Sequence, residues 1–181
     1  MAARAARITS GNLTRIFLAL PEYDTYEDDD LAQQDEVSLR RALGEALRLI
    51  GDRLMLVGES RDVNPDPQKL EIIDMLVDEI GGTLKVLNRS GAIQLQGERR
   101  DAITALETVD MQLMMLLEQM EQAVVDLLCD DAAIFPMSVR DLSVFLDAFL
   151  DLVEERNRLL GMGWESEMRL NFFPGLSQEP S

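Results

Sequence analysis

The chain has 181 residues, 46% of them hydrophobic and 28% charged, with one cysteine and no histidine. Its formal net charge of −17 disfavours direct binding to nucleic-acid phosphates and to anionic membrane surfaces. The lack of histidine removes the commonest general base and transition-metal ligand, and a lone cysteine excludes an intramolecular disulfide.

The chain is long enough for one domain with a hydrophobic core. No apolar run approaches the roughly 20 residues of a membrane-spanning helix. The run from Ile16 to Leu20 is too short for the core of a signal peptide. We therefore expect a cytoplasmic protein without a membrane span.

Residues 1–36 are predicted to lie outside the main fold. A basic, alanine-rich arm comes first and ends at Pro21. Residues 22–36 then hold eight acidic and no basic side chains, which predicts a solvated loop. The apolar side chains of the arm predict a docking segment, either helical or irregular: Leu13, Ile16, Phe17 and Leu20.

Apolar residues recur at spacings of three and four in four later segments, which is the pattern of amphipathic helices. The predicted helices run over about 36–57, 67–88, 98–128 and 138–161. Asp66 and Pro67 suit the start of the second helix, and Ser138 with Asp141 suits the start of the fourth.

Gly81 and Gly82 interrupt the second helix and allow an alternative, a hairpin of residues 83–87 and 92–96. The helix is favoured because the apolar face continues through Leu84 and Leu87. The predicted fold class is therefore all-α.

An antiparallel bundle of about four main helices is expected over residues 37–161, since short connections place successive helices antiparallel. Residues 162–181 form an apolar C-terminal tail that contains Trp164, Phe172 and Phe173.

The search for catalytic chemistry finds one set of acids at helical spacing. Glu71, Asp74 and Asp78 share a helix face and resemble half of an all-helical Mg²⁺-dependent phosphohydrolase site. The second half would have to come from Glu118 and Glu121. A solvated acidic face explains the same residues, so we predict no catalytic residues, no metal and no cofactor.

Two charged side chains interrupt otherwise apolar helix faces. Arg53 and Asp110 are predicted to form a structural ion pair across the bundle, with Arg156 as the rival partner for Asp110. Alternatively, both charges lie at the margin of the apolar face and Arg53 extends its head to water. Cys129 is predicted to be a small buried hydrophobe.

These features favour a non-enzymatic helical interaction protein: an adaptor, an assembly chaperone or a small subunit of a larger complex. Its expected partner is another protein or a second copy of the chain. The expected partner-binding residues come from both arms: Leu13, Ile16, Phe17, Leu20, Trp164, Phe172 and Phe173.

Two other functions remain open. One is an acidic mimic that inhibits a nucleic-acid-binding protein, because residues 22–36 carry a charge of −8 and residues 98–131 a charge of −7. The other is the Mg²⁺-dependent phosphohydrolase.

Overall fold

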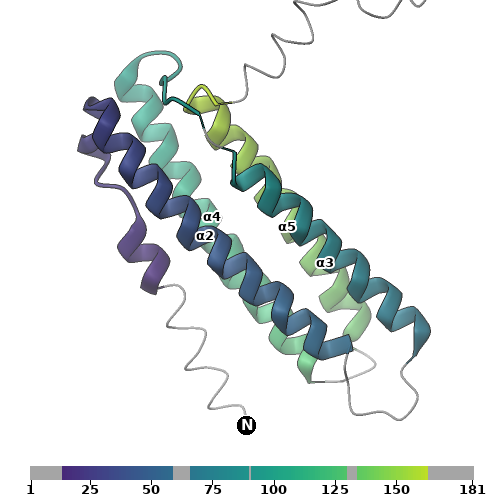
Figure 1. The fold of residues 1–181 in the computed structure, drawn as a ribbon. Helices are drawn as coiled ribbons and strands as arrows, with labels where there is room; N and C mark the ends of the chain where they lie inside the picture. The colour runs from purple at the N-terminus through teal and green to yellow at the C-terminus, as the bar shows by residue number, and fades with distance from the viewer. Residues whose placement is uncertain (1–13, 59–65, 90, 130–133, 163–181) are drawn as a thin grey trace, which may run out of the picture.

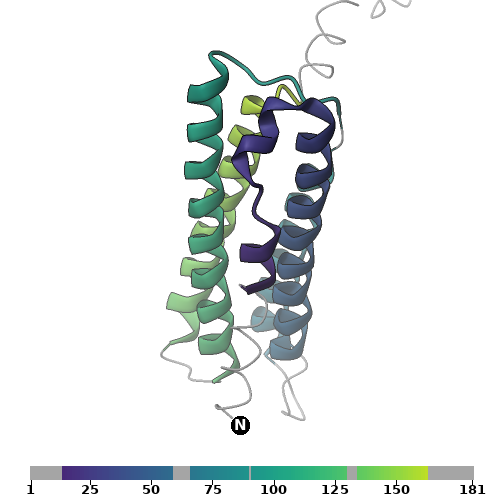
Figure 2. The same cartoon turned by 90° about the vertical axis from the view of Figure 1, so that its left-hand side faces the viewer.

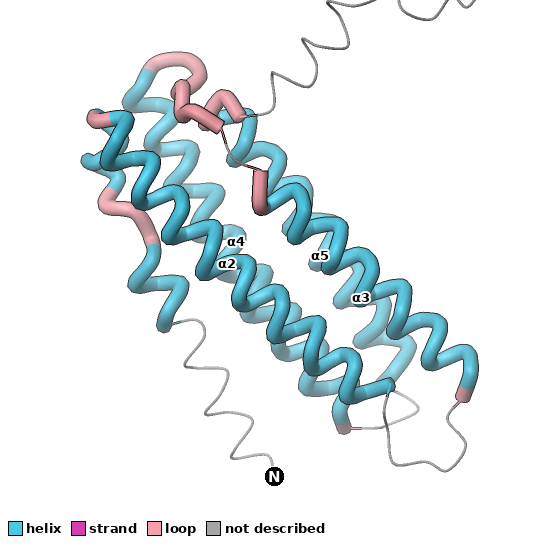
Figure 3. Tube along the Cα trace, viewed as in Figure 1, coloured by secondary structure: helices cyan, strands magenta, loops and turns pink. Residues whose placement is uncertain are grey.

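The structure, a computed structural model, describes residues 14–58, 66–89, 91–129 and 134–162. Within these ranges the chain folds as helices and connecting segments without any strand (Figure 3). The predicted all-α bundle is confirmed. None of the helices in the described ranges has the length and apolarity that crossing a membrane requires.

Five helices with defined bounds make up the fold: η1 (Tyr23–Glu27), α2 (Asp29–Gly58), α3 (Pro67–Leu87), α4 (Arg99–Leu128) and α5 (Phe135–Leu159). The α-helices form a four-sided bundle in which α2 packs against α3 and α4, and α5 packs against the same two helices (Figure 1). Because α2 and α4 run in the same direction, as do α3 and α5, each helix has one parallel and one antiparallel neighbour.

The N-terminal segment lies on one side of this bundle. Residues 14–19 are helical, and η1 packs against both α2 and α4 (Figure 2). Tyr26 is fully buried there. The segment therefore belongs to the core rather than to a detached arm.

Helix α2 begins seven residues earlier than predicted, and η1 occupies residues 23–27, so the expected solvated loop over residues 22–36 is wrong. Ala32 and Glu36 are buried and extend the inner face of α2 backwards by two turns. The side chain of Asp28 accepts hydrogen bonds from the backbone N–H groups of Asp30 and Leu31, at 2.9 and 3.2 Å. The acids of this stretch thus start a helix, where carboxylates stabilise the unpaired amides and the positive end of the dipole.

Helix α3 starts as predicted, with Asp66 accepting a hydrogen bond from the N–H of Gln68 at 3.0 Å. It runs without a break to Leu87, so the alternative hairpin is wrong. Residues 91–96 form a connecting segment that hydrogen-bonds with the end of α5. Gln94 and Gln96 donate backbone N–H groups to the carbonyls of Leu160 and Leu159, at 2.9 and 3.0 Å.

Two local predictions are corrected. Ser138 lies buried inside the first turn of α5, because that helix starts at Phe135 and not after Pro136. Cys129 is exposed at the end of α4, where its Sγ donates to the carbonyl of Val125 at 3.4 Å. The helix ends there, so Cys129 falls beyond the stripe that α4 buries.

The interior is aliphatic over most of its length, as the helical spacing predicted. Its most completely buried apolar side chains include Leu39, Leu43, Leu47, Ile50, Leu54, Leu87, Leu106, Leu113 and Phe149. Towards the end of the bundle where α2 begins, this apolar core gives way to a group of buried charges.

Candidate functional site

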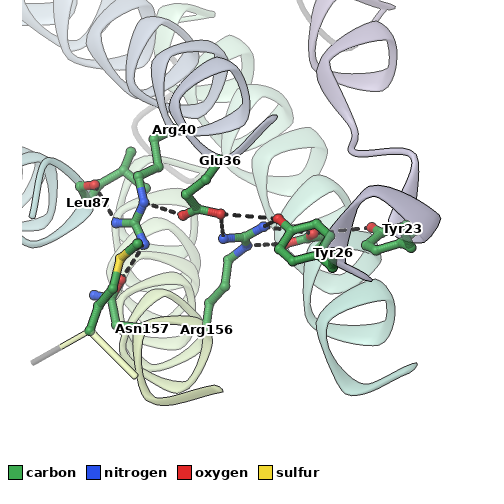
Figure 4. A network of polar contacts seen from close by, with 9 residues as sticks. Tyr23, Tyr26, Glu36, Arg40, Leu87, Arg156 and Asn157 are labelled. Atoms are coloured by element: carbon green, nitrogen blue, oxygen red, sulfur yellow. Dashed lines mark hydrogen bonds and ion pairs between the residues drawn. The ribbon is translucent and has the colours of Figure 1, made fainter. Parts of the chain in front are cut away.

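Arg156 of α5 is the centre of the buried charges (Figure 4). Its side chain is almost completely buried, at 2% exposure. Nε donates to Oδ1 of Asp110 on α4 at 2.5 Å, and Nη2 donates to Oδ2 of the same carboxylate at 3.2 Å. Nη1 donates to Oε2 of Glu36 on α2. One guanidinium therefore bridges α5 to its neighbour α4 and to α2, which lies diagonally opposite.

Two tyrosines of η1 complete the shell around Arg156. Tyr26 accepts from Nη2 of Arg156 at 3.2 Å and donates to Oε2 of Glu36 at 3.3 Å. Tyr23 donates its hydroxyl to Oδ2 of Asp110 at 3.1 Å, and the two tyrosine rings stack with centroids 6.3 Å apart. The network thus holds η1 against the bundle.

Arg40 extends the network toward α3 and the end of α5. Its Nε donates to Oε1 of Glu36, and its Nη1 donates to the carbonyl of Leu87 at 2.7 Å. Its Nη2 donates to Oδ1 of Asn157 at 2.5 Å and lies 3.3 Å from Sδ of Met162. Arg40 therefore satisfies a carbonyl at the C-terminal end of α3, where a helix leaves such groups unpaired.

Burial and the neighbouring opposite charges shift the pKa values of these groups in opposite directions. Burial acts to raise the pKa of Glu36, but attraction and hydrogen bonds to Arg156 and Arg40 outweigh it and hold this pKa below its ordinary value. Burial raises the pKa of Asp110, and Arg156 offsets only part of that effect. Although burial acts to lower the pKa of Arg156, Glu36 and Asp110 raise it well above its ordinary value.

The two tyrosines stay protonated. Burial, followed by the nearby Asp110 carboxylate, raises the pKa of Tyr23 above its ordinary value. Burial likewise raises the pKa of Tyr26, and this effect exceeds the opposing attraction of Arg156. Both hydroxyls therefore act as neutral donors in the network.

This arrangement is suited to structure and not to catalysis. Each carboxylate is held by guanidinium and tyrosine donors, and Glu36, Asp110 and Arg156 are all at most 2% exposed. A substrate would have to displace these bonds in the buried interior. Such buried ionic groups have a better attested role in setting the register of packed helices. We assign the network that role.

The predicted pair of Arg53 and Asp110 is corrected by this geometry. Asp110 pairs with Arg156, the rival partner, and Arg53 lies 3.9 Å from Oε1 of Glu121 on α4. Because α2 begins at Asp29, Arg53 is 24 residues into its helix, whereas Asp110 is 11 residues into α4. At about 1.5 Å per residue, the parallel helices hold the two side chains roughly 20 Å apart along the bundle.

The N-terminal arm splits into buried and exposed residues. Ile16 is 1% exposed and belongs to the core, and Leu20 is half-buried against it. Phe17 and Leu18 are 62% and 78% exposed. Ile16 is thus anchored in the core, whereas the ring of Phe17 is mostly exposed. The other expected partner-binding residues lie outside the described residues: Leu13, Trp164, Phe172 and Phe173.

The two acidic sets proposed for a metal do not meet. Glu71, Asp74 and Asp78 are exposed on α3, which packs against α2 and α5. Glu118 and Glu121 belong to α4, which lies diagonally opposite α3. In the part of the chain that the structure describes, no three acidic, histidine or cysteine side chains lie close enough together to hold a metal ion.

The sequence reading missed Glu36, Arg40 and the two tyrosines as members of the network. A signal was present: Glu36 and Arg40 are one turn apart, and Leu39 and Leu43 continue the same face. The predicted boundary at about Glu36 left the two tyrosines outside any helix, and the predicted buried face began only at Leu39, without Glu36 and Arg40.

No protein-family model, curated protein sequence or solved structure matches this chain.

Proposed function

We propose that the chain is a non-enzymatic helical bundle that binds another protein, as an adaptor, an assembly chaperone or a small subunit of a complex. The observation that carries the proposal is the pair Phe17 and Leu18, which a fully buried Ile16 holds on the bundle while both remain largely exposed. Because the bundle already holds these two large apolar side chains in place, less conformational entropy is lost when a partner binds them. A cytoplasmic location and a protein partner are parts of the same proposal.

The charged network supports this view indirectly. Its buried ion pairs and hydrogen bonds connect η1, α2, α4 and α5. The bundle thereby offers a rigid support for the exposed N-terminal turn. A panel of nucleotides with Mg²⁺ or Mn²⁺ is accordingly expected to show no turnover.

The experiment compares three forms of the full chain in affinity purification from the native host. The test variant is Phe17→Ser with Leu18→Ser, and the control is Val144→Ser, which changes an apolar residue of α5 that is 54% exposed. The double variant should lose a stoichiometric partner that the wild type and the control retain. Retention of the partner by all three forms would exclude Phe17 and Leu18 as the binding surface.

One observation favours the acidic mimic as a second candidate. Burial and the charge of Asp147 on α5 together raise the pKa of Glu79 on α3, so acids of two neighbouring helices act on one another. A partner that binds this acidic surface would be lost on Glu79→Gln with Asp147→Asn and kept by the Phe17 and Leu18 variant. The same purification therefore separates the two functions.

A further inference from the structure

A shallow groove of about 470 Å³ runs between α2 and the C-terminal end of α3. Val37 and Leu84 give it an apolar lining, and Gly44 also lines it. A Cβ atom at Gly44 would lie 3.7 Å from Cδ2 of Leu84 and from Cδ2 of Leu87. A Cβ there would make ordinary van der Waals contacts, and the groove offers apolar contact to an occupant.

The rim of this groove is basic, although the whole chain carries a net charge of −17. Arg41, Arg48 and Arg89 line it and are exposed, and Glu45 is the single acid among its lining residues. Glu45 lies 3.4 Å from Arg41 in an exposed pair, which neutralises part of one charge. The groove therefore favours an occupant that combines carboxylates with apolar side chains.

The chain leaves the described structure beside this groove. Sδ of Met162 lies 3.3 Å from Nη2 of Arg40, and Arg40 itself lines the groove. Nineteen residues follow Met162. At about 3.3 Å per extended residue they can reach roughly 60 Å, about twice the length of a 21-residue helix such as α3. The C-terminal residues can thus cover the whole groove.

The sequence of these residues has the required chemistry. Glu165 and Glu167 come within five residues of Met162, and the apolar residues Trp164, Phe172 and Phe173 lie on either side of them. We propose that residues 163–181 dock into the α2–α3 groove, with the glutamates on the arginine rim and the apolar side chains against Val37 and Leu84. The attachment at Met162 supplies an effective concentration on the order of millimolar.

This inference is independent of the proposed function, because it involves neither Phe17 nor Leu18. It assigns Trp164, Phe172 and Phe173 to an intramolecular contact in place of the partner contact expected from sequence.

Trp164 is the sole tryptophan, so its fluorescence reports directly on the tail in the full chain. The test variant is Arg48→Glu with Arg89→Glu. The control is Arg100→Glu with Arg140→Glu, which makes the same charge change at two exposed arginines outside the groove. Wild type and control should show blue-shifted emission and weak quenching by acrylamide. The groove variant should show red-shifted emission and strong quenching.

A charge exchange tests whether the contact is direct. Adding Glu165→Lys and Glu167→Lys to the groove variant should restore the protected emission. Wild-type Trp164 that is quenched as readily as in a synthetic peptide of residues 163–181 would overturn the proposal, because the groove would then be free for an acidic partner. Protection that grows with protein concentration, together with a dimer in light scattering, would overturn it in favour of docking between copies.

Discussion

Arg156 and Glu36 form an ion pair across the diagonal of the bundle, although the two residues are 120 positions apart in the sequence. Both side chains are at most 2% exposed. The same guanidinium also holds Asp110, so three of the four α-helices meet at one side chain. We assign this group the role of fixing the relative height of these helices.

Removing Arg156 should therefore destabilise the protein strongly. Arg156→Met leaves two buried carboxylates without their main partner, and we expect a loss of about 3–5 kcal/mol in the free energy of unfolding. The control is Arg158→Met, two residues along α5, which breaks an exposed pair with Glu155 at 2.6 Å. Urea unfolding of both variants measures the difference. Equal effects would show that the buried pair contributes no more than the exposed one.

Double-mutant cycles should separate the observed ion pair from the one expected from sequence. The cycle of Arg156→Met with Asp110→Leu should give a coupling energy above about 0.5 kcal/mol, because the two groups share two hydrogen bonds. The cycle of Arg53→Met with Asp110→Leu should give a value near zero, because these side chains lie far apart along the bundle. A large coupling in the second cycle would contradict the helix register.

The stability contributed by Glu36 should depend on pH. Its pKa in the folded protein lies below the ordinary value of 4.5, because Arg156 and Arg40 outweigh its burial. The unfolded chain therefore takes up this proton first as the pH falls, and stability is lost below about pH 4.5. Glu36→Gln should be much less stable than wild type at neutral pH, and the gap should narrow in acid.

The ionisation of Asp110 should change the stability in the opposite direction. Since burial raises its pKa above the ordinary value of 3.8, the folded state holds this proton more tightly, and ionisation of Asp110 costs stability as the pH rises. Denaturant unfolding of wild type, Glu36→Gln and Asp110→Asn across the acid range measures the pH dependence of stability that each residue contributes. A gap between wild type and Glu36→Gln that stays constant with pH would contradict the role given to Glu36.

A glycine inside a helix and a glycine just after a helix should respond oppositely to alanine. Gly82 is exposed within α3 and no atom lies within 4 Å of the place a Cβ would take, so Gly82→Ala should stabilise by up to about 1 kcal/mol. Gly161 has a φ of +70°, and its Cβ would lie 2.4 Å from the carbonyl oxygen of Gln94. Gly161→Ala should lower the melting temperature, whereas Gly82→Ala should raise it.

Substitutions in the N-terminal helical turn should distinguish a residue needed for stability from a residue proposed for binding. Ile16→Ala should cost about 2–5 kcal/mol, because this side chain is fully buried. Phe17→Ala should change stability by no more than about 0.5 kcal/mol, because the ring is 62% exposed. Thermal unfolding of both variants tests this division. A large loss of stability from Phe17→Ala would show that the ring belongs to the core.

The sequence by itself determined the helices and most of their buried faces. Asp66 and Pro67 marked the start of α3, and the spacing of leucines predicted its continuation through Gly81 and Gly82. These features are local, since a helix cap and an apolar stripe depend on residues a few positions apart.

Only the tertiary structure decided which charges are buried and with which partners. The acidic block over residues 22–36 has one composition, yet Asp28 starts a helix at the surface and Glu36 lies in the core. What distinguishes them is the position of Arg156, 120 residues after Glu36. An ion pair depends on helix start points and on which helices lie diagonally opposite, and an error of seven residues in the start of α2 moved Arg53 by about two turns.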